Sequence, residues 1–157
     1  MINSRFLYTS NEGVQYYTYE NLSEAKTQGF EFDGMLRFWK NYRLTLGYSY
    51  LETLDVAQDK PFFNRPKHSA RIKVDWDITH FGFSGNIRWR FIGDRLYINL
   101  QGDEIMAPWY ATWYTRLQQR IYEPVSLYLE VNNIFDYQSR EYVALPGRLV
   151  FVGLQIN

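Results

Sequence analysis

The sequence contains no cysteine and only two histidines, His68 and His80. Without cysteine the chain can form neither disulfide bonds nor thiolate metal sites, and the two histidines are too few and too far apart to hold a metal ion. An excess of one charge is also missing, because 17 basic and 17 acidic side chains give a formal net charge of zero. This balance leaves no electrostatic footprint for nucleic acid. We therefore expect no cofactor, no metal and no nucleic-acid partner.

Long apolar runs are missing as well. No segment approaches the roughly 20 consecutive apolar residues that a membrane-spanning helix needs. The first residues, MINSRFLYTS, lack the basic start and apolar core of a secretory signal. Any export signal is therefore expected on a longer precursor, or the protein is not exported. At 157 residues the chain is one domain or a piece of a larger one.

Aromatic residues are abundant: 14 Tyr, 11 Phe and 5 Trp make up 19% of the chain. Mean hydropathy is nonetheless −0.42, because polar and apolar residues are interleaved. The alternation has a period of two, which predicts β-strands rather than helices. It runs through residues 29–39, 42–50, 69–78, 81–91, 109–121 and 125–132, and through a last strand with Val150, Val152, Leu154 and Ile156 on one face.

The connections between these segments alternate in length. Residues 39–42, 78–82 and 121–125 form tight turns, whereas 52–68, 94–108 and 135–147 are long polar links. This pattern predicts an all-β antiparallel meander, with short turns at one end and long loops at the other. A provisional first strand at 2–9 and a long second strand from about Val14 to Phe38 bring the count to about eight.

The apolar face of this meander points either into a soluble sandwich or lipocalin-like barrel, or outward to lipid. Three features favour lipid. The apolar face carries large aromatics without the small residues that fit a tapered core. Strands of about 10–15 residues are long enough to cross a bilayer, and aromatic rings bunch at strand ends as in an interfacial girdle. The opposite face is densely charged, at Arg71, Lys73, Asp75, Asp77, Arg88, Arg90, Arg116 and Arg120. A transmembrane β-barrel is therefore expected.

Several short motifs carry a family resemblance. VNNIFD at 131–136, followed by LPGRLVFVGLQIN to the end of the sequence, resembles the last two strands of TonB-dependent outer-membrane receptors. That family closes its penultimate strand with V-x-N-[LI]-F-D and begins its last strand with P-G-R. YEN at 19–21, Ala25, GFEFD at 29–33 and RPKH at 65–68 stand upstream in the family's order. The likeness extends from about Tyr19 to the end.

The resemblance implies a C-terminal segment, residues 1–157, of a barrel of about 22 strands with a plug in its lumen. Such receptors import scarce nutrients, of the ferric siderophore, haem or cobalamin class, through the outer membrane. They are energised through the TonB complex, which acts on a segment ahead of the plug. The expected partners are outer-membrane lipid, the missing strands and plug, the TonB complex and a small-molecule or metal-chelate ligand. The family commonly ends on an aromatic residue, whereas this sequence ends on Ile156-Asn157.

No enzyme site is legible. Ser69, Ser84 and Ser126 have no base at a readable spacing, so no catalytic residue is expected. Asn132 and Asn133 are interpreted as strand-end residues whose side chains satisfy local backbone groups. Pro146-Gly147-Arg148 is interpreted as a turn in which glycine allows a backbone conformation that other residues do not tolerate. The Arg148 side chain is expected to pair with a carboxylate of the barrel wall or with the plug.

The interior charges are of both signs, and this favours ion-pair networks over a substrate site. Substrate contact is expected instead in the long loops, which face outward and can close over a ligand. Aromatic rings and arginines in these loops suit planar, anionic ligands such as ferric chelates. The candidate substrate contacts are Phe62, Phe63, Arg95, Tyr97 and Arg140.

Three hypotheses remain open from the sequence. The chain is the C-terminal portion of a TonB-dependent receptor, a self-contained eight-stranded barrel with a structural or adhesion role, or a soluble sandwich with a charged outer face. The eight-stranded barrel closes around a narrow lumen, in which Arg88, Arg90, Arg116 and Arg120 need matched acids. In a receptor fragment the first and last strands are unpaired edges that closure or partner chains must cover.

Overall fold

The computed structural model describes residues 2–9, 15–21, 24–99, 101–139, 141–142 and 145–156, the first two ranges as backbone only. Within them no helix is long and apolar enough to cross a membrane. The elements in chain order are β1 (Ile2–Thr9), β2 (Gln15–Asn21), β3 (Ala25–Phe38), β4 (Tyr42–Asp55), β5 (His68–Ile78), the 3₁₀ turn η1 (Thr79–Phe81), β6 (Phe83–Ile92), β7 (Arg95–Ile98), β8 (Glu104–Ala107), β9 (Tyr110–Tyr122), β10 (Val125–Asn132) and β11 (Leu149–Ile156).

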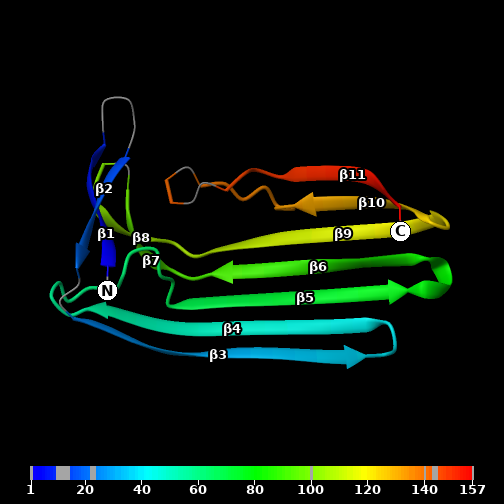
Figure 1. The fold of residues 1–157 in the computed structure, drawn as a ribbon, viewed down its shortest axis with the longest axis horizontal. Coiled ribbons are helices and arrows are strands. Elements are labelled where there is room, and N and C mark those ends of the chain that lie inside the picture. The colour runs from blue at the N-terminus through cyan, green and yellow to red at the C-terminus, as the bar shows by residue number, and fades with distance from the viewer. Residues whose placement is uncertain are drawn as a thin grey trace.

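One antiparallel sheet dominates the structure. It has seven strands in the order β11-β10-β9-β6-β5-β4-β3. Short turns join β3 to β4, β5 to β6 and β9 to β10 at one end of the sheet, and the long connections lie at the other end (Figure 1). The turn η1 is capped at its C-terminal end by Gly82, whose φ of 61° is left-handed. The predicted meander with alternating connection lengths is confirmed.

The strand count differs from the expected eight. The segment 2–9 pairs only with β2, in a separate two-stranded sheet. The predicted second strand is therefore divided into β2 and β3, and β3 alone belongs to the large sheet. The long link at 94–108 contains a further hairpin, β7–β8. Its turn is held by the Asn99 side chain, whose Oδ1 accepts hydrogen bonds from the backbone N–H groups of Gln101 (3.0 Å) and Asp103 (2.8 Å).

The two faces of the large sheet have opposite character. Leu46, Ile72, Trp89 and Trp113 stand opposite one another on β4, β5, β6 and β9 and form a row across one face. The next row consists of Gly47, Arg71, Arg90 and Thr112 and lies on the other face. The register thus keeps every strand's apolar set on one side, as the period of two requires.

The apolar face is uncovered. Among the described hydrophobic side chains only Ile92 and Ala107 are buried, whereas Phe32, Leu36 and Val152 are 56%, 59% and 69% exposed. A soluble sandwich would bury this face against a second sheet, and no second layer packs on it within the described residues. The arrangement fits a sheet whose apolar face contacts lipid.

Aromatic rings on this face gather at two levels. Phe38, Trp39 and Tyr42 contact one another at the turn end, with ring centroids 5.6–5.9 Å apart. At the loop end the contacts are Phe30 with Tyr50, Phe91 with Trp109 and Trp113 with Phe135. Amphipathic rings at both ends of an apolar band are typical of the two interfaces of a membrane barrel.

Candidate functional site

Arg95 and Tyr97 both lie on β7, and both contact Tyr142. Arg95 is only 6% exposed; its Nη2 donates a hydrogen bond to the Tyr142 carbonyl oxygen (3.0 Å), and its guanidinium lies 5.5 Å from the Tyr110 ring centroid. The Tyr97 ring meets the Tyr142 ring edge-on at 6.3 Å. Arg95 Nη1 is buried without a hydrogen-bond partner among the described residues. These contacts join the 94–108 hairpin to the loop before β11.

Phe62 and Phe63 lie in the neighbouring connection, between β4 and β5. Both are half-buried, and the Phe62 backbone N–H donates to Thr53 Oγ1 (3.0 Å). The same connection reaches β7 through a hydrogen bond from the Asn64 N–H to the Leu96 carbonyl oxygen (2.8 Å). Arg140 lies outside the described residues.

A cavity of ≈ 800 Å³ opens between the loop ends of β3 and β4 and the β7–β8 hairpin. Arg95 and Arg65 line it together with apolar Leu54, Leu96 and Met106. Its size lies within the range of small-molecule sites, about 300–1,000 Å³. The arrangement of a few charged groups over apolar walls suits an amphipathic or chelated ligand.

The VNNIFD and PGR motifs meet in one tight structure before β11. Asn133 is 5% exposed and has a left-handed φ of 55°. Its Nδ2 donates to the carbonyl oxygens of Tyr137 (2.8 Å) and Pro146 (3.2 Å), and its Oδ1 accepts from the Tyr137 N–H (2.9 Å). Asp136 Oδ1 accepts from the Arg148 backbone N–H (2.6 Å). The predicted backbone-satisfying role is thereby confirmed for Asn133. It is wrong for Asn132, whose Nδ2 donates to the Glu130 side chain.

The predicted reason for Gly147 is wrong. Gly147 does not have a positive φ; among the described glycines those that do are Gly82 and Gly102. A Cβ at Gly147 would instead lie 2.6 Å from Gln138 Nε2 and 2.9 Å from Asp136 Oδ1. Glycine lets these two side chains approach the backbone closely, and a larger residue would require the Gln138 and Asp136 side chains to shift. The partner of the Arg148 side chain stays a prediction.

Asp136 makes this loop sensitive to acid. The hydrogen bonds from the Arg148 backbone N–H and from the Gln138 amide hold the pKa of the Asp136 carboxyl below its ordinary value. A depressed folded-state pKa stabilises the fold above the ordinary Asp pKa of about 3.9, and this stabilisation is lost as pH falls through the folded-state pKa. We expect the urea midpoint of the intact protein to exceed that of Asp136→Asn at pH 7, and the gap to narrow toward pH 3. A gap independent of pH would contradict this role.

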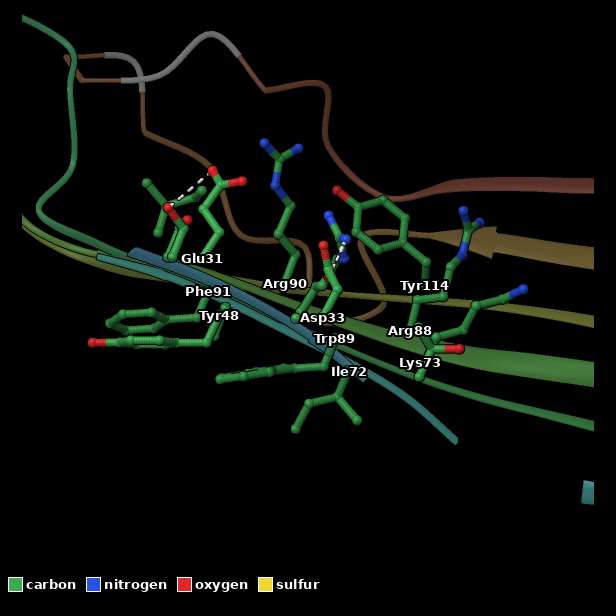
Figure 2. A pocket seen from close by; sticks show the side chains of 17 residues that line it. Glu31, Asp33, Tyr48, Ile72, Lys73, Arg88, Trp89, Arg90, Phe91 and Tyr114 are labelled. Carbon is green, nitrogen blue, oxygen red and sulfur yellow. Dashed lines mark hydrogen bonds and ion pairs between the residues drawn. The ribbon is translucent and has the colours of Figure 1, made fainter. Parts of the chain in front are cut away.

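The charged face of the sheet carries a second cavity, of ≈ 560 Å³, toward its loop end. Figure 2 shows Glu31, Asp33 and Arg90 on one side of the sheet and Ile72 and Trp89 on the other. The predicted ion-pair networks are present in part. The pairs on this face are Arg71–Asp33, Lys73–Asp75 (2.6 Å), Arg43–Asp75 (3.4 Å), Arg116–Glu130 (3.4 Å) and Arg120–Glu123 (2.6 Å).

Arg88 and Arg90 do not join these networks. Both are exposed, and neither forms an ion pair with a described carboxylate. The Arg88 guanidinium lies 5.5 Å from the Tyr114 ring centroid. The prediction of paired networks is therefore wrong for these two arginines within the described residues. The tight turn at 79–82 fixes the register of β5 against β6 and places Arg71 opposite Arg90. This register could have been read from the sequence, and it shows two cations facing each other without an acid between them.

Within the described part of the chain, no group of three or more His, Cys, Asp or Glu side chains could hold a metal ion. The imidazole of His68 is occupied by Tyr48, whose Oη lies 2.7 Å from His68 Nδ1. His80 stacks edge-on against Phe81 at 5.1 Å, in the turn between β5 and β6.

Comparison with known sequences gives two matches. The family described as "TonB dependent receptor-like, beta-barrel" matches residues 1–134. The Ferric-pyoverdine M114 receptor PbuA of Pseudomonas sp. (strain M114) is 28% identical over 151 residues, which cover 85% of this chain and 17% of that receptor. The chain thus spans about a sixth of the length of this curated relative.

Solved structures share the fold. The copper transporter OprC superposes with a TM-score of 0.72 at 17% identity, over 98% of this chain and 26% of that one. The siderophore receptor PirA from Acinetobacter baumannii gives a TM-score of 0.71 at 19% identity, with the same coverage. At these identities the likeness concerns the fold alone. The structural likeness covers 98% of the chain and so reaches β11, beyond residue 134, where the family match ends.

Proposed function

Because the chain belongs to the TonB-dependent receptor β-barrel family, we propose that it forms part of the wall of a receptor that imports a scarce nutrient through the outer membrane. The nutrient is of the ferric siderophore, haem or cobalamin class, and uptake is energised through TonB. In this proposal residues 1–157 are the C-terminal segment of the barrel. The plug and the earlier strands lie in the rest of the receptor.

Family membership bears directly on location and chemistry. TonB-dependent receptors are outer-membrane proteins and are not enzymes. The predicted outer-membrane location and the predicted lack of catalytic activity are therefore confirmed. The apolar face, with its two aromatic levels, is the surface that contacts lipid.

The observation that carries the proposal is the open sheet. β3 and β11 are its two outer strands and do not pair with each other. Exposed strand edges of this length promote aggregation through pairing with other chains, unless further strands cover them. This supports a wall that is completed by further strands of the receptor, and it disfavours the self-contained eight-stranded barrel with a structural or adhesion role.

The ligand class rests on the curated relative, which is a ferric-pyoverdine receptor. We propose that Phe62, Phe63, Arg95, Tyr97 and Arg140 contact the ligand from the long loops. The test is uptake of radiolabelled ferric pyoverdine, haem and cobalamin by cells expressing the full-length receptor, with and without TonB. TonB-dependent uptake of one of them is expected, and uptake of none would contradict the proposal.

Arg95 provides the sharpest test of the loop site. Replacing Arg95 with Gln removes a buried charge that holds two loops and lines the loop cavity. The affinity of the full-length receptor for its ligand is expected to fall about tenfold or more, because charge-assisted hydrogen bonds are the strong ones. Lys60→Gln, in the neighbouring loop and paired with Glu104, is the matched control. Equal affinities of the two variants would exclude Arg95 from the site.

A further inference from the structure

One wall of the ≈ 800 Å³ cavity at the loop end belongs to the apolar face of the large sheet. The residues of β4 that line this cavity include Glu52 and Leu54. Side chains two residues apart on a strand point to the same side, so both share a face with Tyr50 and with Leu46 in the apolar row. This wall of the cavity therefore continues the surface that contacts lipid.

The β7–β8 hairpin supplies a second wall. Leu96 and Met106 stand opposite each other in the hairpin, and both line the cavity. The neighbouring Arg95 directs its guanidinium toward the Tyr110 ring, and Tyr110 shares the charged face with Thr112, two residues further along β9. Because successive side chains of a strand alternate, Leu96 and Met106 point to the opposite, outward side. The cavity thus opens away from the lumen.

The cavity also lies at the depth of the lipid headgroups. Gln28 stands opposite Glu52, two residues beyond the Phe30–Tyr50 pair, whose rings belong to the aromatic level at the loop end. Two residues of a strand advance about 6.5–7 Å. The headgroup layer on each side of a bilayer is about 5–8 Å thick. A cavity lined by Gln28 and Glu52 is therefore level with the headgroups of the outer leaflet.

Two exposed cations stand at this depth. Arg65 and Lys67 both line the cavity from the connection between β4 and β5. Lys67 Nζ donates a hydrogen bond to Glu52 Oε1 (2.8 Å) and lies 5.5 Å from the Tyr50 ring centroid. An ammonium group has three donors, more than these two contacts use. Cations beside an apolar surface match an anionic lipid, which has a charged head and apolar chains.

We propose that Arg65 and Lys67 bind the phosphate group of an outer-leaflet lipid, whose acyl chains lie along the apolar face of β4 and β5. Guanidinium and ammonium groups hold phosphate through charge-assisted hydrogen bonds. A plug occupies the lumenal side, and further strands add beyond β3 and β11, whereas β4 is already paired with β3 and β5. The rest of the receptor therefore leaves this site facing lipid. The inference goes beyond nutrient import and concerns how the wall is anchored in its membrane.

The test is the binding of lipid to the purified full-length receptor in mild detergent, titrated by native mass spectrometry. The probes are diphosphorylated lipid A and the same lipid with its phosphates removed. The wild type is expected to prefer the phosphorylated form. Arg65→Gln/Lys67→Gln is expected to lower the affinity for this form about tenfold or more, with the dephosphorylated form unaffected, because each cation near an anionic lipid surface contributes about fivefold.

Two further variants separate loss of charge from loss of fold. Arg65→Gln alone leaves the Lys67–Glu52 ion pair in place and is expected to lower the affinity about fivefold. Arg65→Lys/Lys67→Arg keeps both charges and is expected to retain most of the affinity. If this charge-preserving variant loses as much as Arg65→Gln/Lys67→Gln, the loss comes from the fold and the inference is wrong.

The matched control is Arg43→Gln/Lys60→Gln. It removes two cations that have carboxylate partners in Asp75 and Glu104 and that do not belong to the described lining of the cavity. Both lipid affinities are expected to stay unchanged in this control. An equal fall in the control, or no fall in Arg65→Gln/Lys67→Gln, would overturn the inference. Full displacement of the lipid by an excess of inorganic phosphate would also overturn it, because the site would then bind a free anion without using the apolar wall.

Discussion

Replacing Asn133 with Ala is expected to lower the free energy of unfolding by about 3–5 kcal/mol. The Asn133 side chain is buried and makes three hydrogen bonds that tie residues 133–137 to Pro146. Its removal abolishes these three hydrogen bonds, each of which contributes about 0.5–1.5 kcal/mol net. Alanine at a φ of 55° adds about 1 kcal/mol. Urea unfolding of the full-length receptor in detergent measures this loss.

The neighbouring Asn132 is the matched control. Its side chain makes one hydrogen bond, from Nδ2 to Glu130 Oε1 at 3.2 Å, and its backbone is part of β10. Asn132→Ala is expected to cost about 1 kcal/mol or less. If the two variants unfold at the same urea concentration, the Asn133 hydrogen bonds do not hold the last strand in place.

Replacing Leu46 with Arg is expected to destabilise the receptor in the membrane by about 2–4 kcal/mol, because the new charge lies on the lipid face near mid-depth. Leu46 stands between Gly34 and Ile72, midway between the two aromatic levels. Reversible folding into lipid vesicles measures the change. The amount of receptor assembled in the outer membrane is expected to fall with it.

Met35→Arg is the control for the face. Met35 is 63% exposed but lies on the charged side of β3, opposite Thr45 and almost level with Leu46. An arginine there points into the lumen and is expected to cost less than about 1 kcal/mol. Equal costs for the two variants would contradict the assignment of the apolar face to lipid.

The large sheet was predictable because its information is local. A period of two places each side chain on a face without reference to any partner, and tight turns such as 79–82 leave little freedom of register. The alternation at 69–78 and 81–91 therefore predicted both β5 and β6 and the faces they present. The short motifs also predicted membership of the TonB-dependent receptor family, and the family match over residues 1–134 confirms it.

The long connections were not predictable in the same way. The hairpin β7–β8 depends on Asn99 capping its own turn, and the pairing of β1 with β2 depends on register rather than on alternation. Arg88 and Arg90 have no carboxylate partner among the described residues because the acids on the neighbouring strands are engaged elsewhere, and one of them, Asp75, is shared between Arg43 and Lys73. The crowding at Gly147 comes from the Asp136 and Gln138 side chains, which reach it across a loop whose conformation the alternation does not predict.

The mass of the native particle that contains this chain tests the central claim most directly. The particle would be extracted from outer membranes in mild detergent and weighed by light scattering or native mass spectrometry. If the chain is part of a receptor wall, the folded particle is several times heavier than the 18.9 kDa of these 157 residues and contains further barrel strands. A folded, heat-modifiable particle of about 19 kDa, with β3 paired to β11, would contradict it.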